Sequence, residues 1–304
     1  MTFVVAVTDN DWANFLRRRP ALEEINFWSP SGGQGFRALR PGELFLFKLH
    51  APENLIVGGG VFTYATQCPC SLAWSAFGEG NGVGSEHELR EKIARHRRVW
   101  DRPLPDFVIG CRILTNPFFF DETSALPPPR DWARNIVTFK TYETDSAEGR
   151  RLWDEVAARV QAAKIPREEP LPRYGEPVLV RPRLGQGTFR LVVADLYERR
   201  CAVTRERTLP ALEAAHIRPY AQGGSHEPRN GILLRRDIHA LYDSGYVTIT
   251  PDFRFEVSRR IREEYENGRA YYALNGQPVA PPTKRDEAPD PETLRWHRDN
   301  VFLG

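Results

Sequence analysis

Four polar residues in the C-terminal third of the chain have types and spacings that suit phosphodiester chemistry. His216 lies in the stretch LEAAHIRPY, residues 212 to 220, where an apolar run meets a proline turn. Asn230 follows 14 residues later, His239 another 9 and Asp243 another 4. His239 and Asp243 are four residues apart, so they share one face if that segment is helical. The question is what such a set could do once a fold brings it together.

Hydrolysis of a phosphodiester needs a base that activates water and a cation that stabilises the leaving oxygen. A histidine with a pKa near neutrality is suited to be the base, which makes His216 the candidate. A divalent ion held by His239 and Asp243 would supply the cation. We expect Asn230 to fix the geometry of the loop and to orient the base by hydrogen bonding. The alternative is that His216 is a structural histidine at a strand end, but core polar groups rarely cluster in this order.

The elements that must position these residues are a strand, a loop, a second strand and a helix. The first strand ends at His216, the polar loop RPYAQGGSHEPRN ends at Asn230, GILL (231 to 234) forms the second strand, and a helix begins near Arg235. The loop also contains His226, which we expect to be a solvated histidine. The separations match what a small metal finger of two strands and one helix can hold together.

The segment AAHIRPYAQGGSHEPRNGILLRRDIHALYDSGYVTI resembles the HNH nuclease family, whose fold is the ββα-metal finger also found in colicin nucleases. The resemblance runs from about Leu184 to the C-terminus. It implies that His216 is the general base, that Asn230 is the middle asparagine of the motif and that His239 is a metal ligand. Asp243 lies where the family places a second ligand on the helix.

One position departs from the family pattern. Many HNH nucleases have a metal-binding Asp or His immediately before the base, whereas this chain has Ala215. Glu213, two residues earlier on the same strand face, could reach the ion directly or through water. An inactive finger that only binds DNA is the alternative that Ala215 leaves open. The His and carboxylate pair suits Mg²⁺ or Mn²⁺ and tolerates Ni²⁺ or Zn²⁺.

The part of the chain before this finger has the pattern of a small, mainly β barrel with a few helices. A proline-rich stretch divides the chain into domains at 1–162 and 181–304, joined by a linker at 163–180. Asp9 or Asn10 predicts one helix start and Ser85 another. The fold class predicted for the whole chain is α+β. The predicted strands of the first domain cover 3–8, 43–49, 55–66, 107–114 and 135–142.

In size, strand order and partnership with a nuclease, the first domain is similar to the PUA-like superfamily, which includes the EVE, ASCH and SRA modules. Several of those families read a modified base, which requires flipping the base out and stacking it between aromatic walls. The glycine run at 58–60 and the many aromatic residues favour a barrel with a pocket. Packing in the core is the alternative for each aromatic residue. The candidate pocket residues are Phe27, Trp28, Trp74, Phe77 and Trp132.

Composition sets the broad class of the protein. With 41% hydrophobic and 27% charged residues the chain is expected to be globular, and four cysteines without paired CxxC clips argue against a zinc ribbon or a disulfide scaffold. No apolar run is long enough to span a membrane and no signal peptide is recognised, so we expect a cytoplasmic protein. The formal net charge is only +2. Arginines suit phosphate contacts, and those expected around the site are Arg181, Arg183, Arg190, Arg218, Arg235 and Arg236.

The sequence therefore predicts a metal-dependent DNA endonuclease of the modification-dependent restriction type. Its partner would be double-stranded DNA carrying a modified base, with modified cytosine as the expected target. One rival is an HNH nuclease whose first domain senses phosphorothioate, RNA or a nucleotide messenger. A second is a DNA-binding protein with an inactive finger. Whether the nuclease forms a homodimer is left open.

Overall fold

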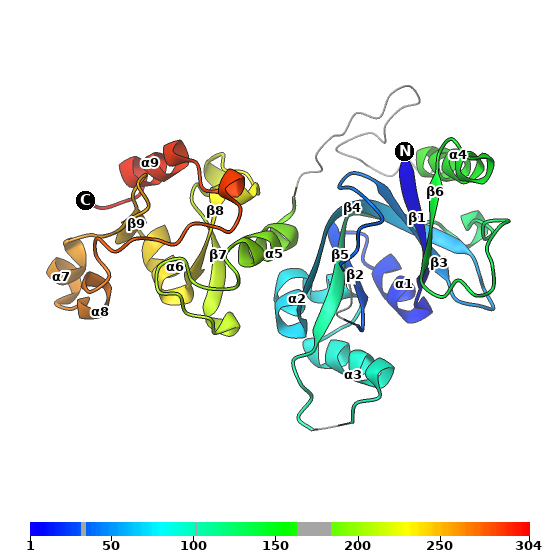
Figure 1. The fold of residues 1–304 in the computed structure, drawn as a ribbon, viewed down its shortest axis with the longest axis horizontal. Coiled ribbons are helices and arrows are strands. Elements are labelled where there is room, and N and C mark those ends of the chain that lie inside the picture. The colour runs from blue at the N-terminus through cyan, green and yellow to red at the C-terminus, as the bar shows by residue number, and fades with distance from the viewer. Residues whose placement is uncertain (32–34, 101, 163–183) are drawn as a thin grey trace. The chain divides into compact units, whose positions relative to one another are not determined.

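The computed structural model of the chain describes residues 1–31, 35–100, 102–162 and 184–304. It divides into two compact units, Met1–Pro182 and Arg183–Gly304, both built from helices and strands (Figure 1). The predicted α+β class is confirmed. The predicted linker at 163–180 lies outside the described residues.

A six-stranded mixed sheet forms the centre of the N-terminal unit. Its hydrogen-bonded order is β2-β5-β4-β3-β1-β6. Strands β1 and β3 are parallel and every other neighbouring pair is antiparallel. The strands are β1 (Thr2–Thr8), β2 (Glu24–Ser29), β3 (Leu44–Leu49), β4 (Ile56–Pro69), β5 (Val108–Phe119) and β6 (Phe139–Glu143). Pairing of the end strands β2 and β6, which would close a barrel, is not found among the described residues, so barrel closure stays a prediction.

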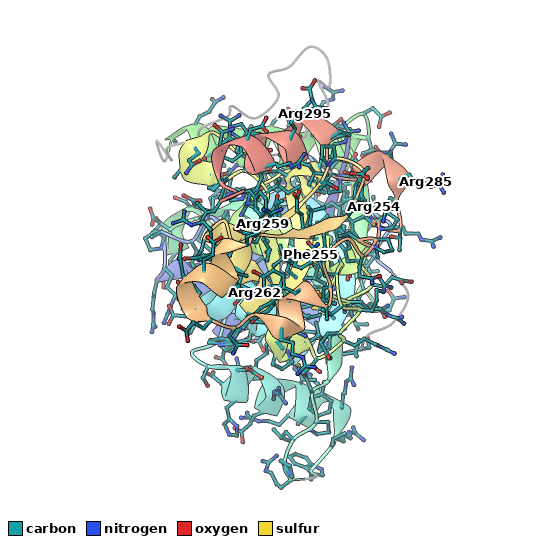
Figure 2. All side chains as sticks on the ribbon, turned by 90° about the vertical axis from the view of Figure 1, so that its left-hand side faces the viewer. Arg254, Phe255, Arg259, Arg262, Arg285 and Arg295 are labelled. Atoms are coloured by element: carbon teal, nitrogen blue, oxygen red, sulfur yellow. The ribbon has the colours of Figure 1, made fainter. Side chains whose placement is uncertain are left out.

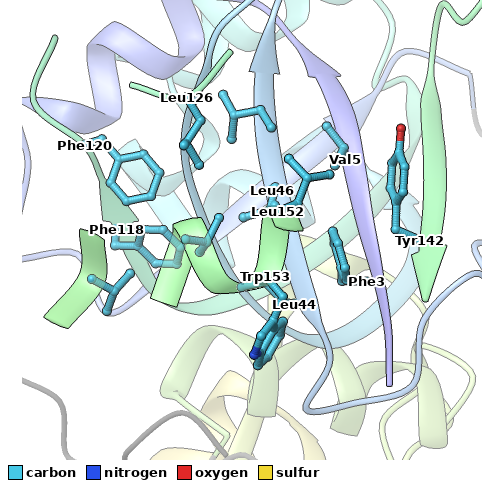
Figure 3. Packing of buried hydrophobic residues seen from close by; sticks show 13 residues of the cluster. Phe3, Val5, Leu44, Leu46, Phe118, Phe120, Leu126, Tyr142, Leu152 and Trp153 are labelled. Atoms are coloured by element: carbon cyan, nitrogen blue, oxygen red, sulfur yellow. The ribbon is translucent and has the colours of Figure 1, made fainter. Parts of the chain in front are cut away.

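Alternation along the central strands gives this unit two cores. Phe3 and Val5 of β1 belong to one buried cluster, whereas Val4 and Ala6 belong to a second one. This follows from the strand period of two, which points successive side chains to opposite faces. The first cluster also contains Leu44, Leu46, Leu152 and Trp153 (Figure 3), and so joins the sheet to helix α4 (Ala147–Ala162).

Two of the predicted helix starts are confirmed in this unit. The Asp9 side chain accepts from Trp12 N at the start of α1 (Asn10–Arg17), and Ser85 accepts from Glu88 N at the start of α3 (Glu86–Arg97). Strand β2 and helix α2 (Cys70–Phe77) were not predicted. Helix α2 has no side-chain cap and follows directly on Pro69 of β4. It therefore lacks the polar start signal that marks α1 and α3. Strand β6 starts at Phe139, later than the predicted residue 135.

The glycine run in β4 lies where neighbouring strands come very close. A Cβ atom on Gly58 would be 2.1 Å from Phe118 O, and one on Gly59 would be 2.7 Å from Phe45 O. The ladders of β4 with β3 and β5 are also irregular near these residues. The glycines are therefore required by close backbone approach within the sheet.

The C-terminal unit is organised around a short hairpin and the helix that follows it. Strand β7 (Leu212–His216) pairs antiparallel with β8 (Gly231–Arg235), so that His216 lies opposite Gly231. Helix α6 (Arg236–Asp243) follows β8 directly, and helix α5 (Gln186–Leu196) contacts both strands. The strand, loop, strand and helix order predicted from the sequence is present.

The rest of this unit supports the hairpin and its helix. Strands β9 (Val247–Ile249) and β10 (Phe255–Val257) form a second antiparallel pair in this unit. From α9 (Pro291–Asn300), the buried ring of His297 lies at hydrogen-bond distance from Thr248 Oγ1 and Tyr242 O, which ties α9 to β9 and α6. The remaining helices are α7 (Arg260–Tyr265) and α8 (Arg269–Tyr272). Short 3₁₀ turns cover Gly78–Asn81, Glu122–Ser124, Leu209–Ala211, Tyr220–Gln222, Pro228–Asn230 and Arg285–Glu287.

The break between α7 and α8 contains two residues in the left-handed region. Helix α7 ends at Tyr265, and the left-handed residue that caps it is Glu266, with φ of 55°. Gly268 has φ of 100° and directly precedes α8. Among the described residues, no helix combines the length and the apolar character needed to cross a membrane.

The close approach around Gly58 predicts a large difference between two glycine substitutions. Gly58→Ala should lower the free energy of unfolding by about 2 to 3 kcal/mol, because the added methyl group meets a backbone oxygen. Gly35→Ala serves as the control, since a Cβ there would have no neighbour within 4 Å and no positive φ is recorded for it. Urea unfolding followed by tryptophan fluorescence measures both. Equal stabilities of the two variants would contradict this explanation of the glycine run.

Candidate active site

The β7–β8 hairpin and helix α6 bring the predicted chemical residues together. His216 is the last residue of β7, Asn230 directly precedes β8, and His239 and Asp243 lie on α6. Glu213 of β7 reaches across to α6, where its Oε2 lies 3.0 Å from His239 Nδ1. The structure thus places Glu213 beside His239, and the neighbouring His239 is one of the groups that lower the pKa of His216.

The ring of His216 is held on one face and at one edge. It stacks on Phe189 of α5 with a centroid distance of 4.1 Å and an interplanar angle of 9°. Its Nε2 atom lies 3.0 Å from His226 Nδ1. Burial, followed by the neighbouring imidazoles of His226 and His239, lowers the pKa of His216 to about 4. The ring is therefore neutral at neutral pH and able to accept a proton.

His226 is a member of this site that sequence reasoning missed. It was expected to be solvated, but its ring contacts His216 and stacks on Tyr220 with a centroid distance of 4.8 Å. The expectation was wrong because the loop folds back over the end of β7. The sequence signal for this was only a histidine four residues before Asn230 in an otherwise polar loop.

Asn230 is buried and its side chain closes the loop between the two strands. Its Oδ1 accepts from Arg218 N at 2.9 Å, and its Nδ2 donates to Arg218 O at 2.9 Å and to Ser225 O at 2.8 Å. These are bonds to backbone atoms at both ends of the loop. Asn230 therefore acts on the loop that holds His226, rather than directly on the ring of His216.

His239 lies between two carboxylates, one at each ring nitrogen. Glu213 Oε2 is 3.0 Å from Nδ1, and Asp243 Oδ2 is 3.3 Å from Nε2. The two ring nitrogens point in different directions, so the two carboxylates do not converge on one point. The side chain of Asp243 is 58% exposed, whereas that of Glu213 is 32% exposed. The open side of His239 is therefore the one shared with Asp243.

The donor set of His239 Nε2 and Asp243 Oδ2 fits a hard divalent ion that completes its coordination with water and phosphate oxygens. Within the described ranges no cluster of three or more His, Cys, Asp or Glu side chains is arranged to hold a metal. The residues therefore fit a two-ligand protein site, with Glu213 at the far nitrogen of the same histidine. A carboxylate in that place fixes the orientation of a metal-binding histidine.

The arginines predicted around the site have different surroundings. Arg236 Nε lies 2.9 Å from Glu213 Oε1, and burial lowers the pKa of half-buried Arg190, which the charge of Glu213 opposes. Arg235 is held by Asp237 through two hydrogen bonds of 2.6 and 2.7 Å. Arg218 donates to Gln222 O and lies over the ring of Trp296. Arg181 and Arg183 lie outside the described residues.

Further exposed arginines belong to the same unit. Figure 2 shows five of them on one side, from the segments around β10, α7 and α9, and all five are exposed. None of these five is among the arginines that the sequence predicted as phosphate contacts. The five are Arg254, Arg259, Arg262, Arg285 and Arg295.

The aromatic residues predicted to line a base pocket are distributed over the N-terminal unit. The ring of Phe27 contacts Trp12, Phe45 and Phe47, whereas Trp28 donates to Asn81 O and lies against His96. The structure thus gives these two neighbours in the sequence different surroundings.

The other three candidates of this group lie in two places. Phe77 is buried at the end of α2, which also carries half-buried Trp74. Trp132 packs against the core cluster that contains Phe3 and Val5. The Lys48 ammonium lies over its ring, 5.0 Å from the centroid. Phe27 and Trp132 therefore belong to different cores, and the five side chains do not form one pocket wall in the described structure.

Comparisons with known proteins match the segment that contains this site to a family model. Residues 201–250 match the family model described as HNH endonuclease. No curated protein is similar in sequence to the chain.

Several solved structures are similar in fold to parts of the chain. The ASCH protein of Zymomonas mobilis is 11% identical, with 50% of this chain and 94% of that chain covered, at a TM-score of 0.33. Its Y47F variant is 10% identical, covering 50% of this chain and 96% of that chain, at 0.34. A modification-dependent restriction endonuclease, TagI, is 14% identical over 93% of this chain and 76% of that chain, at 0.29. At these TM-scores each structural likeness is weak.

The matched residues run from Cys201, shortly after α5, to Thr250, just after β9. They include His216, Asn230, His239 and Asp243, which are the residues that β7, β8 and α6 hold together. Residues 201–250 of this chain are therefore an HNH endonuclease domain.

Proposed function

We propose that this protein is a metal-dependent DNA endonuclease of the modification-dependent restriction type. The N-terminal unit would recognise a modified base, with modified cytosine as the expected target, and the HNH domain would hydrolyse the backbone. The nuclease activity in this proposal rests on one observation. Within the matched segment, a neutral His216 that stacks on Phe189 occurs together with the His239 and Asp243 pair. The half of the proposal that concerns base recognition rests on the resemblance of the first domain to PUA-like modules in size, strand order and partnership with a nuclease.

In this proposal His216 is the general base and His226 positions it. When Nε2 of His216 carries the proton, it donates to Nδ1 of His226, and Nδ1 of His216 is left as the acceptor. A water then gives its proton to that nitrogen while its oxygen forms a bond to phosphorus. The bond from phosphorus to the leaving oxygen breaks. The stack on Phe189 keeps the ring in the plane that this transfer needs.

We assign His239 and Asp243 as the ligands of a divalent ion, with Mg²⁺ or Mn²⁺ favoured by the donor types. When bound, the ion supplies positive charge for the leaving oxygen. Glu213 was expected to replace the ligand missing at Ala215. The contact of Glu213 with the opposite ring nitrogen supports a different role, in which it holds His239 with Nε2 directed toward Asp243.

The charges around the site support binding of a phosphate backbone. Arg190 and Arg236 lie beside Glu213. Arg218, at the start of the loop between β7 and β8, lies over the ring of Trp296. Arg235 is engaged by Asp237 and is therefore the weaker candidate for a phosphate contact. Phosphate contacts of this kind position a nuclease on its substrate without reading sequence.

The first experiment tests both halves of the proposal on matched plasmids carrying cytosine, 5-methylcytosine or 5-hydroxymethylcytosine, in Mg²⁺ and in Mn²⁺. We expect cleavage of modified DNA only, and a loss of at least about 100-fold in His216→Ala because the general base is removed. His87→Ala, at an exposed histidine of α3, is the control and should cut normally. Equal cutting of all three plasmids would refute the choice of modified cytosine. No cutting by the unaltered protein would favour an inactive finger or a different ligand of the first domain.

A second experiment separates the metal ligands from Glu213 by calorimetric titration with Mn²⁺ in the absence of DNA. The matched variants are Asp243→Asn and Glu213→Gln. Glu213→Gln keeps a hydrogen-bond acceptor for His239 Nδ1, so we expect a loss of Mn²⁺ affinity of about 10-fold or less. Asp243→Asn should lose clearly more, because it changes a ligand. Equal losses in the two variants would show that Glu213 binds the ion itself.

A third experiment follows the titration of His216 by NMR of its ring protons. Burial and the neighbouring His226 both disfavour the charged ring, so the pKa of His216 lies at about 4, below the ordinary value of 6.5. His226→Ala removes one of these neighbours, and the pKa of His216 should rise toward 6.5. The acid limb of the cleavage rate should then move to higher pH, since the base is protonated sooner. An unchanged titration in His226→Ala would argue against contact between the two rings.

A further inference from the structure

A short basic segment after helix α3 carries an exposed tryptophan. The segment 95–102, RHRRVWDR, has four arginines and one aspartate, a formal net charge of +3, whereas the whole chain carries only +2. Trp100 is 69% exposed, which is unusual for the largest side chain of a soluble protein. We call Arg95, Arg98 and Trp100 the Trp100 segment. The nuclease site uses none of these residues.

Contacts with the neighbouring strands hold the end of α3, where the Trp100 segment begins. Arg97, at the end of α3, donates through Nε to Pro30 O at 2.6 Å and through Nη2 to Val108 O at 2.5 Å. His96 lies edge-on to Trp28 with a centroid distance of 6.3 Å. These contacts join the end of α3 to the end of β2 and the start of β5. Figure 1 shows α3 at the margin of the N-terminal unit.

The remaining cations of the segment point to a negatively charged partner. Arg95 and Arg98 are exposed, and neither has a carboxylate partner among the residues that the structure describes. Arg102 is paired with Glu91 at 3.4 Å and Arg97 is bound to carbonyl groups, so those two are already engaged. Basic residues at a helix C-terminus also interact favourably with the helix dipole. That effect gives no reason for Trp100 to be exposed beside them.

We propose that the Trp100 segment is a DNA contact of the N-terminal unit. Arg95 and Arg98 would bind backbone phosphates, and Trp100 would stack on a base where the duplex is opened. Exposed cations beside an exposed aromatic ring are the combination that binds opened nucleic acid, because every base presents a π face and every nucleotide a charge. This inference rests on the proposed function. It adds where the N-terminal unit meets DNA and the class of substrate, duplex DNA with an unstacked base.

Binding of a fluorescein-labelled duplex with one 5-methylcytosine tests the inference, measured by anisotropy with the full chain in the His216→Ala background. Arg95→Ala combined with Arg98→Ala should reduce the salt dependence of log K by about 1.8, since each phosphate contact contributes about 0.9. Trp100→Ala should weaken binding by about 10-fold, whereas Trp100→Phe should bind nearly as well because it keeps a stacking ring. The control is Arg134→Ala, another exposed arginine of the same unit, which should change neither quantity.

A second readout reports the opened base directly. With 2-aminopurine beside the 5-methylcytosine, binding should raise its fluorescence as the base unstacks, and Trp100→Ala should remove most of that rise. All these side chains are exposed, so each variant should melt like the parent. If the parent binds and the wild-type protein cuts DNA while the Trp100 and arginine variants match Arg134→Ala, the contact is refuted and the proposed function stands. If the parent binds no duplex at all, both fail.

Discussion

The side chain of Asn230 is the constraint on which the candidate active site depends. It satisfies the backbone N–H and C=O of Arg218 and the C=O of Ser225 in a place where water has little access. Buried backbone groups left without partners are costly, so these three bonds define one shape for the loop. That shape carries His226 back to His216. A change at Asn230 would therefore act on the base through the backbone rather than through direct contact.

The two histidines of the candidate site, His216 and His239, have different electrostatic surroundings. His216 lies against Phe189 and His226 and is neutral, whereas His239 lies between Glu213 and Asp243. A base needs a free lone pair and an ion needs anionic ligands, so the two histidines require opposite surroundings. The short β7–β8 pairing provides both, because Glu213 and His216 are three residues apart and alternate strand residues point to opposite faces. One short strand thus carries the proposed base, His216, at its end, and three residues earlier it carries Glu213, which contacts the proposed metal-binding histidine.

The N-terminal unit is built differently, from a mixed sheet with a core on each face. The glycines of β4 allow the neighbouring strands to approach, and the two cores bury most of its aromatic residues. Few aromatic side chains of the described part of this unit are therefore available to a partner. Exposed Trp100 is one of them. The end of α3 can hold Trp100 at the surface because Arg97 anchors this end of the helix. Arg97 donates to the backbone carbonyl groups of Pro30, after β2, and Val108, at the start of β5.

The sequence alone determined the α+β class, the strand, loop, strand and helix order around His216, and the pairing of His239 with Asp243 on one helix. These follow from local patterns: apolar runs of strand length, a polar loop and a four-residue spacing. Strand β2 and helix α2 were missed because neither has a strong period or cap. The contact of His226 with His216 and the position of Glu213 at the far nitrogen of His239 were decided only by the tertiary structure. Both depend on how a loop folds back and how a strand faces a helix, and residue spacing along the chain does not encode such distances.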